Sequence, residues 1–330
     1  MKIGTPFHGT LVLAQAMIIV PLLLSIPAHS QGYPTKPVRL IAPFPPGGTV
    51  DIVSRISARI LGEAWGQQVI VDNRAGAGGI IGTELGAKSA PDGYTLVMGH
   101  VGTLAMNTSL YAKLPYDPVK DLSPIALIVR APNAVVVHPS MPARSIKDLI
   151  GLARAKPGSI LYASAGSGSS THLATVYFEL LAKIQLTHVP YKGTGPALID
   201  LIAGQASLMI PGVAAVMPYL NSGKLKMLAV TSGKRLAALP DVPTVMESGL
   251  SGYEATNWLG LLAPAATPPE IISKLNVALR KGLAEHETNE KLAALGLEME
   301  DSTPQQFGEL IKSEIVRWRP VIKASGAKPQ

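Results

Sequence analysis

The chain has 330 residues, of which 47% are hydrophobic, so about two domains are expected and each half can bury a core of its own. Its 32 glycines and 28 prolines make less than a fifth of the chain, which excludes collagen and low-complexity disorder. The net charge of +7 is spread without a basic run, unlike the charge of nucleic-acid binders. Cysteine is absent, which excludes disulfides, thiolate metal sites and cysteine nucleophiles.

The first thirty residues have the pattern of a secretory signal peptide. No charged residue occurs between Lys2 and Lys36, and residues 11–26 are mostly apolar. Ala28 and Ser30 are the small residues that a signal peptidase requires before its cleavage site. The apolar stretch is shorter than the roughly 20 residues of a spanning helix. We expect residues 1–30 to be removed and the mature chain to be exported, the alternative being an uncleaved anchor.

The following residues alternate between strand and helix patterns. Thr49 is predicted to cap a helix whose apolar residues Val53 and Ile56 follow helical spacing, and Gly66 is predicted to end it. This part of the chain contains predicted strands over 38–44, 68–72 and 95–100, and predicted helices from Thr49 and over 79–90.

The same alternation returns after residue 144, where Ser145 is predicted to cap a helix. Later elements are strands over 160–164, 187–190 and 207–210, and helices over 170–183, 196–203, 268–286 and 304–323. Strands separated by helices predict parallel βαβ units and an α/β fold. Two extended stretches, 134–138 and 258–263, bracket the middle of the chain and are predicted to cross between two lobes.

Four glycine-rich loops connect predicted strands to predicted helices. They are PPGGT (45–49), RAGAGG (74–79), SAGSGSST (164–171) and KGTGP (192–196). Such loops bring backbone amides close to a ligand, and the helix start adds free N–H groups. An anion or a carboxylate is therefore the expected ligand. Glycines that only make tight turns are the alternative for any single loop. Because loops at the carboxyl ends of strands share one crevice, the four together favour a ligand site.

Known catalytic and nucleotide-binding motifs are missing. The glycine loops match neither the dinucleotide fingerprint nor the P-loop, and neither the serine nucleophile elbow nor the His-Glu-x-x-His zinc motif occurs. His172 is the histidine best placed for chemistry, but a hydrogen-bonding or packing role is favoured over general-base work because no paired acid is visible. For Lys192, contact with an anion and a purely solvated side chain are equally favoured. Asp51 is expected to complement the dipole of its helix.

Several ordered blocks together resemble one known family. The blocks are PFPPGGTVD (43–51), DNRAGAGG (72–79), APDGYT (90–95), GSGSSTHL (166–173), HVPYKG (188–193), LAVTS (228–232), PDVPT (240–244) and WLGL (258–261). In this order they resemble the Bug/TctC family, the periplasmic solute-binding proteins of tripartite tricarboxylate transporters. The resemblance covers essentially the whole mature chain.

The resemblance implies a type II periplasmic binding-protein fold with the ligand between two lobes, each an α/β sheet flanked by helices. Lobe one would comprise residues 31–132 and 256–330, and lobe two residues 133–255. The implied ligand contacts are Phe44, Gly47, Gly48, Thr103, Ser164, Ala165, Gly168, Ser169, Thr171, Tyr191 and Gly193. A monomer that is not an enzyme, with no cofactor, no metal and no nucleic acid, is expected.

One departure from the family pattern bears on the ligand. Many members carry an aspartate where this chain reads Ile210 and Pro211, and amino-acid binders use it for the ligand's ammonium group. A mono- or dicarboxylate with an apolar or aromatic body is therefore favoured, delivered to a membrane permease. Two alternatives are a receptor that feeds a sensor system and a secreted serine hydrolase that uses a serine of residues 167–170 with His172.

Overall fold

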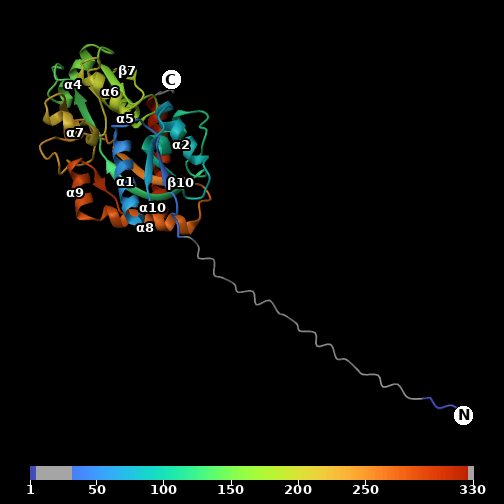
Figure 1. The fold of residues 1–330 in the computed structure, drawn as a ribbon. Helices are drawn as coiled ribbons and strands as arrows, with labels where there is room; N and C mark the ends of the chain where they lie inside the picture. Colours follow the sequence, from blue (N-terminus) through green and yellow to red (C-terminus); the bar gives the residue numbers. More distant parts are fainter. Residues whose placement is uncertain (5–31, 326–330) are drawn as a thin grey trace. The chain divides into compact units, whose positions relative to one another are not determined.

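The structure is a computed structural model that describes residues 1–4 and 32–325, and its strands form two sheets (Figure 1). The six-stranded sheet has the order β11 (Glu298–Met299), β4 (Leu122–Ala131), β10 (Asn257–Pro264), β3 (Thr95–His100), β1 (Val38–Ala42) and β2 (Val69–Asn73). The five-stranded sheet has the order β7 (Thr187–Pro190), β6 (Leu161–Ser164), β8 (Leu208–Met209), β5 (Ala134–Val137) and β9 (Lys226–Val230). Apart from residues 1–4, the predicted signal peptide lies outside the described residues.

Each sheet combines a parallel part with an antiparallel part. β1 pairs in parallel with β2 and β3, and β6 pairs in parallel with β7 and β8, as the predicted βαβ units require. β10 is antiparallel to β3 and β4, and β5 is antiparallel to β8 and β9. The α/β class predicted from the sequence is confirmed. The antiparallel strand pairs were not predicted.

The prediction that 134–138 and 258–263 cross between lobes is wrong. β5 belongs only to the five-stranded sheet and β10 only to the six-stranded sheet. The chain passes from one sheet to the other through residues 132–133, after β4, and through residues 231–256, after β9. Both strands lie in the interior of their own sheets, so the connections between the strands, and not the strands themselves, make the passage. The lobe boundaries at 133 and 256 stay predictions.

The helices follow the strands in the predicted alternation. Their bounds are α1 (Thr49–Trp65), η1 (Ala77–Gly79), α2 (Ile80–Ala87), η2 (Gly102–Met106), α3 (Asn107–Leu110), α4 (Ile146–Ala155), α5 (Ser170–Ala182), α6 (Thr194–Ile202), α7 (Val213–Asn221), α8 (Pro269–Leu283), α9 (His286–Ala294) and α10 (Pro304–Ser325). Among the described residues, none of the helices has both the length and the apolar character needed to cross a membrane.

Helix boundaries test the predicted caps. Ser145 caps α4, since its side chain accepts a hydrogen bond from Asp148 N, and Gly66 ends α1 with a left-handed φ of 64°. Thr49 does not cap α1 as predicted. It is the first helical residue, and the cap position belongs to Gly48, whose extended backbone makes the turn without a side-chain bond.

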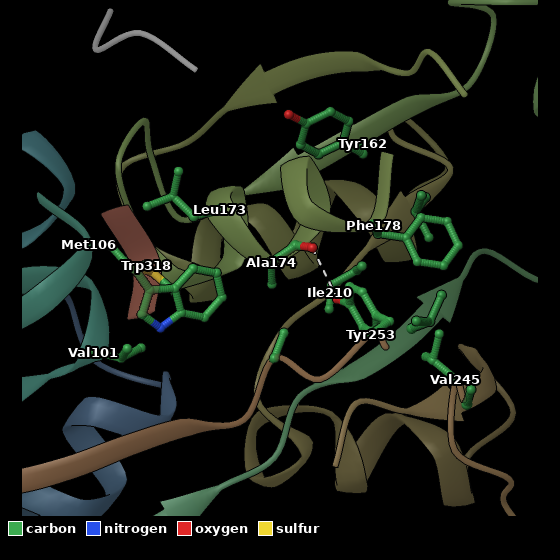
Figure 2. Close-up of a cluster of buried hydrophobic side chains, with 14 of the residues drawn as sticks. Val101, Met106, Tyr162, Leu173, Ala174, Phe178, Ile210, Val245, Tyr253 and Trp318 are labelled. Carbon is green, nitrogen blue, oxygen red and sulfur yellow. Dashed lines mark hydrogen bonds between the residues drawn. The ribbon is translucent and has the colours of Figure 1, made fainter. Parts of the chain in front are cut away.

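α10 joins the two sheets, because it contacts β4 of the six-stranded sheet and also α5, which follows β6 of the five-stranded sheet. Figure 2 shows Trp318 of α10 in the same buried cluster as Phe178 and Tyr253. Within this cluster the Tyr253 hydroxyl donates to Ala174 O over 3.0 Å. The indole N–H groups of Trp318 and Trp258 both donate to one carboxylate oxygen, Glu314 Oε2, at 3.0 and 3.2 Å.

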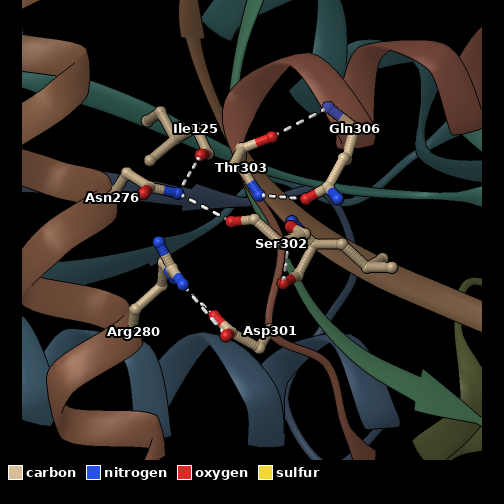
Figure 3. Close-up of polar contacts among 8 residues, drawn as sticks. Ile125, Asn276, Arg280, Asp301, Ser302, Thr303 and Gln306 are labelled. Atoms are coloured by element: carbon tan, nitrogen blue, oxygen red, sulfur yellow. Dashed lines mark hydrogen bonds and ion pairs between the residues drawn. The ribbon is translucent and has the colours of Figure 1, made fainter.

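A buried amide fastens α8 to β4. Asn276 is 5% exposed, and its Nδ2 donates to Ile125 O at 2.8 Å and to Ser302 O at 2.9 Å (Figure 3). Ser302 Oγ in turn accepts a hydrogen bond from Leu127 N over 2.8 Å. One side chain of α8 therefore satisfies carbonyl groups on β4 and on the segment that leads into α10.

Replacing this amide is expected to destabilise the fold. Asn276→Ala removes both donors and leaves two buried carbonyl groups without them, so the free energy of unfolding should fall by about 2–3 kcal/mol. Urea denaturation followed by circular dichroism measures the change. Lys274→Ala, at an exposed position of the same helix, is the control and should change stability by less than about 0.5 kcal/mol. Equal effects of the two substitutions would contradict this assignment.

Candidate ligand-binding site

Loops from both sheets enclose a small cavity, here called the inner cavity. Its volume is about 20 Å³. The residues that line it are Phe44, Gly48, Thr49, Val50, His100, Asn133, Ala165, Ser169, Ser170, Thr171, Thr194, Gly212 and Asn257. None of them is an acidic or a permanently charged residue. The wall therefore consists of backbone, hydroxyl, amide, imidazole and apolar groups.

Four helices begin at the wall of the inner cavity. Gly48 and Ser169 are the cap residues of α1 and α5, Thr194 is the first residue of α6, and Gly212 is the cap residue of α7. The first N–H groups of a helix have no acceptor within the helix, and the helix dipole adds positive potential there. At α7 the first N–H group, Val213 N, already donates to Pro132 O at 2.9 Å, so this helix contributes mainly its dipole. Four helix starts around a cavity without carboxylates favour an anion inside it.

A second cavity of about 330 Å³, the outer cavity, shares Phe44 and Ala165 with the first. Its other lining residues are Gly76, Ala77, Gly78, Gly79, Tyr111, Gly166, Ser167, Pro190, Tyr191 and Lys192. Lys192 is the one charged residue among them. The outer cavity has room for the body of a small organic molecule. The inner cavity has room for a small polar group at the end of that molecule.

Glycines allow the loops of the two sheets to approach each other. A Cβ atom on Gly78, after β2, would lie 2.5 Å from Ser167 O, after β6. A Cβ atom on Gly193, after β7, would lie 2.0 Å from Pro45 Cγ, after β1. Both glycines have positive φ angles, of 63° and 137°. Only glycine fits these positions without moving the opposite loop.

Buried polar contacts shape the first glycine loop. Asp51 accepts hydrogen bonds from Gly47 N at 3.2 Å and from Asn73 Nδ2 at 3.0 Å, and Asn73 Nδ2 also donates to Phe44 O at 2.8 Å. Burial opposes ionisation of Asp51, but the hydrogen bonds from Arg55, Asn73 and Gly47 outweigh it and hold the pKa of this carboxyl below its usual range. Asp51 thus positions the loop, beyond the predicted contact with the helix dipole.

Hydroxyl groups hold the loop before α5. Ser169 Oγ donates to Gly166 O at 2.6 Å and accepts from His172 N at 3.3 Å. Thr171 Oγ1 accepts from Ala165 N at 2.8 Å. These bonds fix the chain around the two glycines of the loop. They leave the first N–H groups of α5 at the cavity wall.

Three stacked rings support this loop from behind. The centroid of the His188 ring lies 4.2 Å from the centroid of the His172 ring and 4.8 Å from that of the Tyr162 ring. His172 Nδ1 accepts a hydrogen bond from Gly168 N, so the structure agrees with the hydrogen-bonding role favoured for this residue. Burial, with the neighbouring His188, lowers the pKa of His172 to about 3, and burial lowers the pKa of His188 to about 4. Both rings are neutral at pH 7.

Two residues that line the inner cavity each carry a buried polar atom with no hydrogen-bonding partner among the described residues: His100 Nε2 and Asn133 Oδ1. The two side chains are 0% and 2% exposed. His100 Nδ1 accepts from Gly102 N at 2.9 Å, and burial lowers the pKa of His100 to about 3. The ring is therefore neutral with its proton on Nε2, which makes this atom a donor. Asn133 Nδ2 donates to Ala255 O at 2.8 Å, which leaves Oδ1 as an acceptor.

The structure brings six of the eleven predicted contact residues to the two cavities. Phe44 and Ala165 line both, Gly48, Ser169 and Thr171 line the inner cavity, and Tyr191 lines the outer cavity. The lining does not include Gly47, Thr103, Ser164, Gly168 and Gly193. Thr103 lies behind His100, whose carbonyl oxygen accepts from its hydroxyl, and Ser164 Oγ is 2.6 Å from His188 Nε2. Ligand contact by any of the eleven stays a prediction.

Among the residues that line the inner cavity, His100, Asn133, Gly212 and Asn257 lie outside the four predicted glycine loops, and sequence reasoning missed them. His100 ends the predicted strand 95–100, and the carboxyl end of a parallel strand was the signal that could have found it. Asn133 and Asn257 lie where the chain passes between the sheets, which no local pattern indicates. Among the described residues, no group of three or more His, Asp or Glu side chains could hold a metal ion.

The chain matches the family model of the tripartite tricarboxylate transporter family receptors, TctC, over residues 53–327. It belongs to this family. The resemblance found in the sequence is thereby confirmed. The protein BugT of Bordetella pertussis strain Tohama I is 39% identical over 306 residues, which cover 92% of this chain and 94% of BugT.

Solved structures agree with this TctC family membership. Rpa4515 of R. palustris, solved with adipate, has a TM-score of 0.88 and 38% identity, and covers 90% of this chain and 100% of its own. The periplasmic binding protein BugD has a TM-score of 0.87 and 35% identity, with the same coverage. MatC from Rhodopseudomonas palustris, with bound malate, has a TM-score of 0.85 and 33% identity over 88% of this chain and 100% of MatC. The predicted periplasmic binding-protein fold is confirmed.

Contact between the loops of this TctC family receptor should contribute to its stability. In Gly78→Ala the new methyl group meets backbone atoms of Ser167 and Gly168, which cannot rotate away, so the loops must separate. We expect a loss of about 2–3 kcal/mol in the free energy of unfolding, measured by urea denaturation.

The control is Gly249→Ala, because Gly249 also has a positive φ, of 100°, but a Cβ atom there would meet nothing within 4 Å. This variant carries only the strain of the left-handed backbone, about 1 kcal/mol. If both variants lose the same stability, the contact between the loops contributes nothing.

Proposed function

We propose that this TctC family receptor is a periplasmic protein that binds a small organic acid, a mono- or dicarboxylate, between its glycine loops. The observation that carries the proposal is the convergence of four helix starts on an inner cavity whose wall has no carboxylate. Adipate in Rpa4515 and malate in MatC, both small dicarboxylates, support the same ligand class. The receptor would deliver its ligand to the permease subunits of a tripartite tricarboxylate transporter, in line with the family's description.

The described contacts do not favour the hydrolase alternative. Ser164 and His188 form a serine–histidine pair at 2.6 Å, but Ser164 is 0% exposed and lines neither cavity. The hydroxyl of Ser169 is committed to Gly166 O, and His172 uses its Nδ1 for Gly168 N. Neither of these bonds of Ser169 and His172 pairs the serine hydroxyl with an imidazole ring that could act as its general base. We therefore propose a receptor without catalytic activity.

Binding is tested with a panel of acids on the purified protein. The panel contains propionate, lactate, succinate, malate, adipate, 2-hydroxyadipate, phenylacetate and mandelate, with the corresponding amides as controls. An acid that binds should raise the unfolding temperature in a saturable way, since a ligand at 100 times its Kd adds about 2.7 kcal/mol to stability. The amides should not. Calorimetric titration gives the Kd, and a panel without any saturable response would refute the proposal.

Lys192 is expected to contribute little to the affinity. Its side chain is exposed, and contacts of exposed charges are worth about 0.2–1 kcal/mol, so Lys192→Gln should weaken binding of the best acid by less than about fivefold. For the same reason, raising the salt concentration from 50 to 500 mM should change the Kd of the native protein only slightly. A loss of a hundredfold in either measurement would show that a charge, and not the helix starts, holds the anion.

Transport and sensing are separated by a different measurement. Vesicles that contain the permease subunits of a tripartite tricarboxylate transporter should take up the labelled acid only when this receptor is added. Uptake at the same rate without the receptor would contradict delivery and leave the sensor role as the alternative.

A further inference from the structure

Two residues that line the inner cavity carry complementary polar atoms whose hydrogen-bonding roles are fixed. His100 Nε2 is a donor because Nδ1 is occupied by Gly102 N, and Asn133 Oδ1 is an acceptor because Nδ2 is occupied by Ala255 O. Neither atom has a partner among the described residues, although both side chains are fully or almost fully buried. The hydroxyl groups in the wall can rotate and so either donate or accept a hydrogen bond. His100 Nε2 can only donate, and Asn133 Oδ1 can only accept.

An unpartnered buried polar atom is unfavourable by about 1–3 kcal/mol, so a ligand that satisfies both atoms gains affinity over one that satisfies only one. A carboxylate oxygen accepts and can satisfy His100 Nε2, together with the helix N–H groups. It has no hydrogen to offer to Asn133 Oδ1. A ligand that also brings a donor close to its carboxylate can satisfy both atoms.

Size and charge restrict this donor. A cavity of about 20 Å³ holds about one or two water-sized atoms, so the donor must lie directly beside a carboxylate oxygen. An ammonium group would donate to Asn133, but it would face four positive helix starts with no carboxylate in the wall. A hydroxyl group on the carbon next to the carboxylate meets both conditions without a charge.

We propose that His100 and Asn133 select 2-hydroxy acids: the carboxylate oxygen accepts from His100 Nε2, and the neighbouring hydroxyl donates to Asn133 Oδ1. The inference rests on the proposed function, because it assumes that a carboxylate enters the inner cavity. In this proposal Asn133 distinguishes a hydroxy acid from its parent acid. His100 contacts the carboxylate of the hydroxy acid and of the parent acid alike.

The test compares matched pairs of acids on the native protein by calorimetric titration. The pairs are lactate and propionate, malate and succinate, 2-hydroxyadipate and adipate, and mandelate and phenylacetate; aspartate is compared with malate for the ammonium group. In the pair whose chain length fits best, the hydroxy acid should bind about tenfold or more tightly than its parent. Malate should bind more tightly than aspartate.

Two asparagine variants assign the preference to a residue. Asn133→Ala removes the free acceptor, while Ala255 O keeps its bond from Thr231 Oγ1 at 3.1 Å, so the preference should fall to within about twofold. Asn257→Ala is the matched control, because Asn257 lines the same cavity but its Oδ1 already accepts from Trp258 N at 2.9 Å. This variant should keep the preference. His100→Phe should weaken the hydroxy acid and its parent by the same factor.

The outcomes separate this inference from the proposed function. Acids that bind without a preference for the hydroxy member in any pair would overturn the inference and leave the receptor function standing. Equal loss of the preference in Asn133→Ala and Asn257→Ala would overturn the assignment to Asn133. If no acid of any pair binds to the native protein, the proposed function itself fails.

Discussion

The close contact between loops that follow strands of different sheets is the constraint on which the candidate site depends. Gly78 lies against Ser167, and Gly193 lies against Pro45, at distances that exclude a side chain on either glycine. These contacts bring the start of α1 from one sheet to the starts of α5, α6 and α7 from the other. Without them, each helix would offer its N–H groups to water, and no cavity would collect their potential.

The passage between the sheets is part of the same construction. Asn133 N donates to Thr231 Oγ1, and both Asn133 Nδ2 and Thr231 Oγ1 donate to Ala255 O. The two connections between the sheets are therefore tied to each other beside the inner cavity. Asn133 therefore both fastens the two connections to each other and lines the inner cavity.

Local patterns were sufficient to predict the parallel strands, many of the helices and the family, because apolar periodicity and glycine turns are properties of short segments. They did not predict the helices that follow β3 and β8, which are η2 with α3 and α7. β4 was not predicted, since Pro124 and polar residues at its ends interrupt the alternation that marks a strand. His100 and Asn133 were not predicted as site residues for a different reason. Their importance lies in the atom that remains without a partner after folding, and the partners, Gly102 and Ala255, are fixed only by the three-dimensional arrangement.

The neutral wall of the inner cavity has a consequence for the release of a bound anion. In a site built on arginine or lysine, release must break an ion pair, and the separated charges attract each other over a long distance. Here the positive potential is divided among helix starts that belong to two sheets, and each is weak alone. Once the loops part, the field at the anion disperses and water replaces the lost hydrogen bonds. Under the proposed function, such a site would hold a carboxylate only while the loops of the two sheets stay in contact.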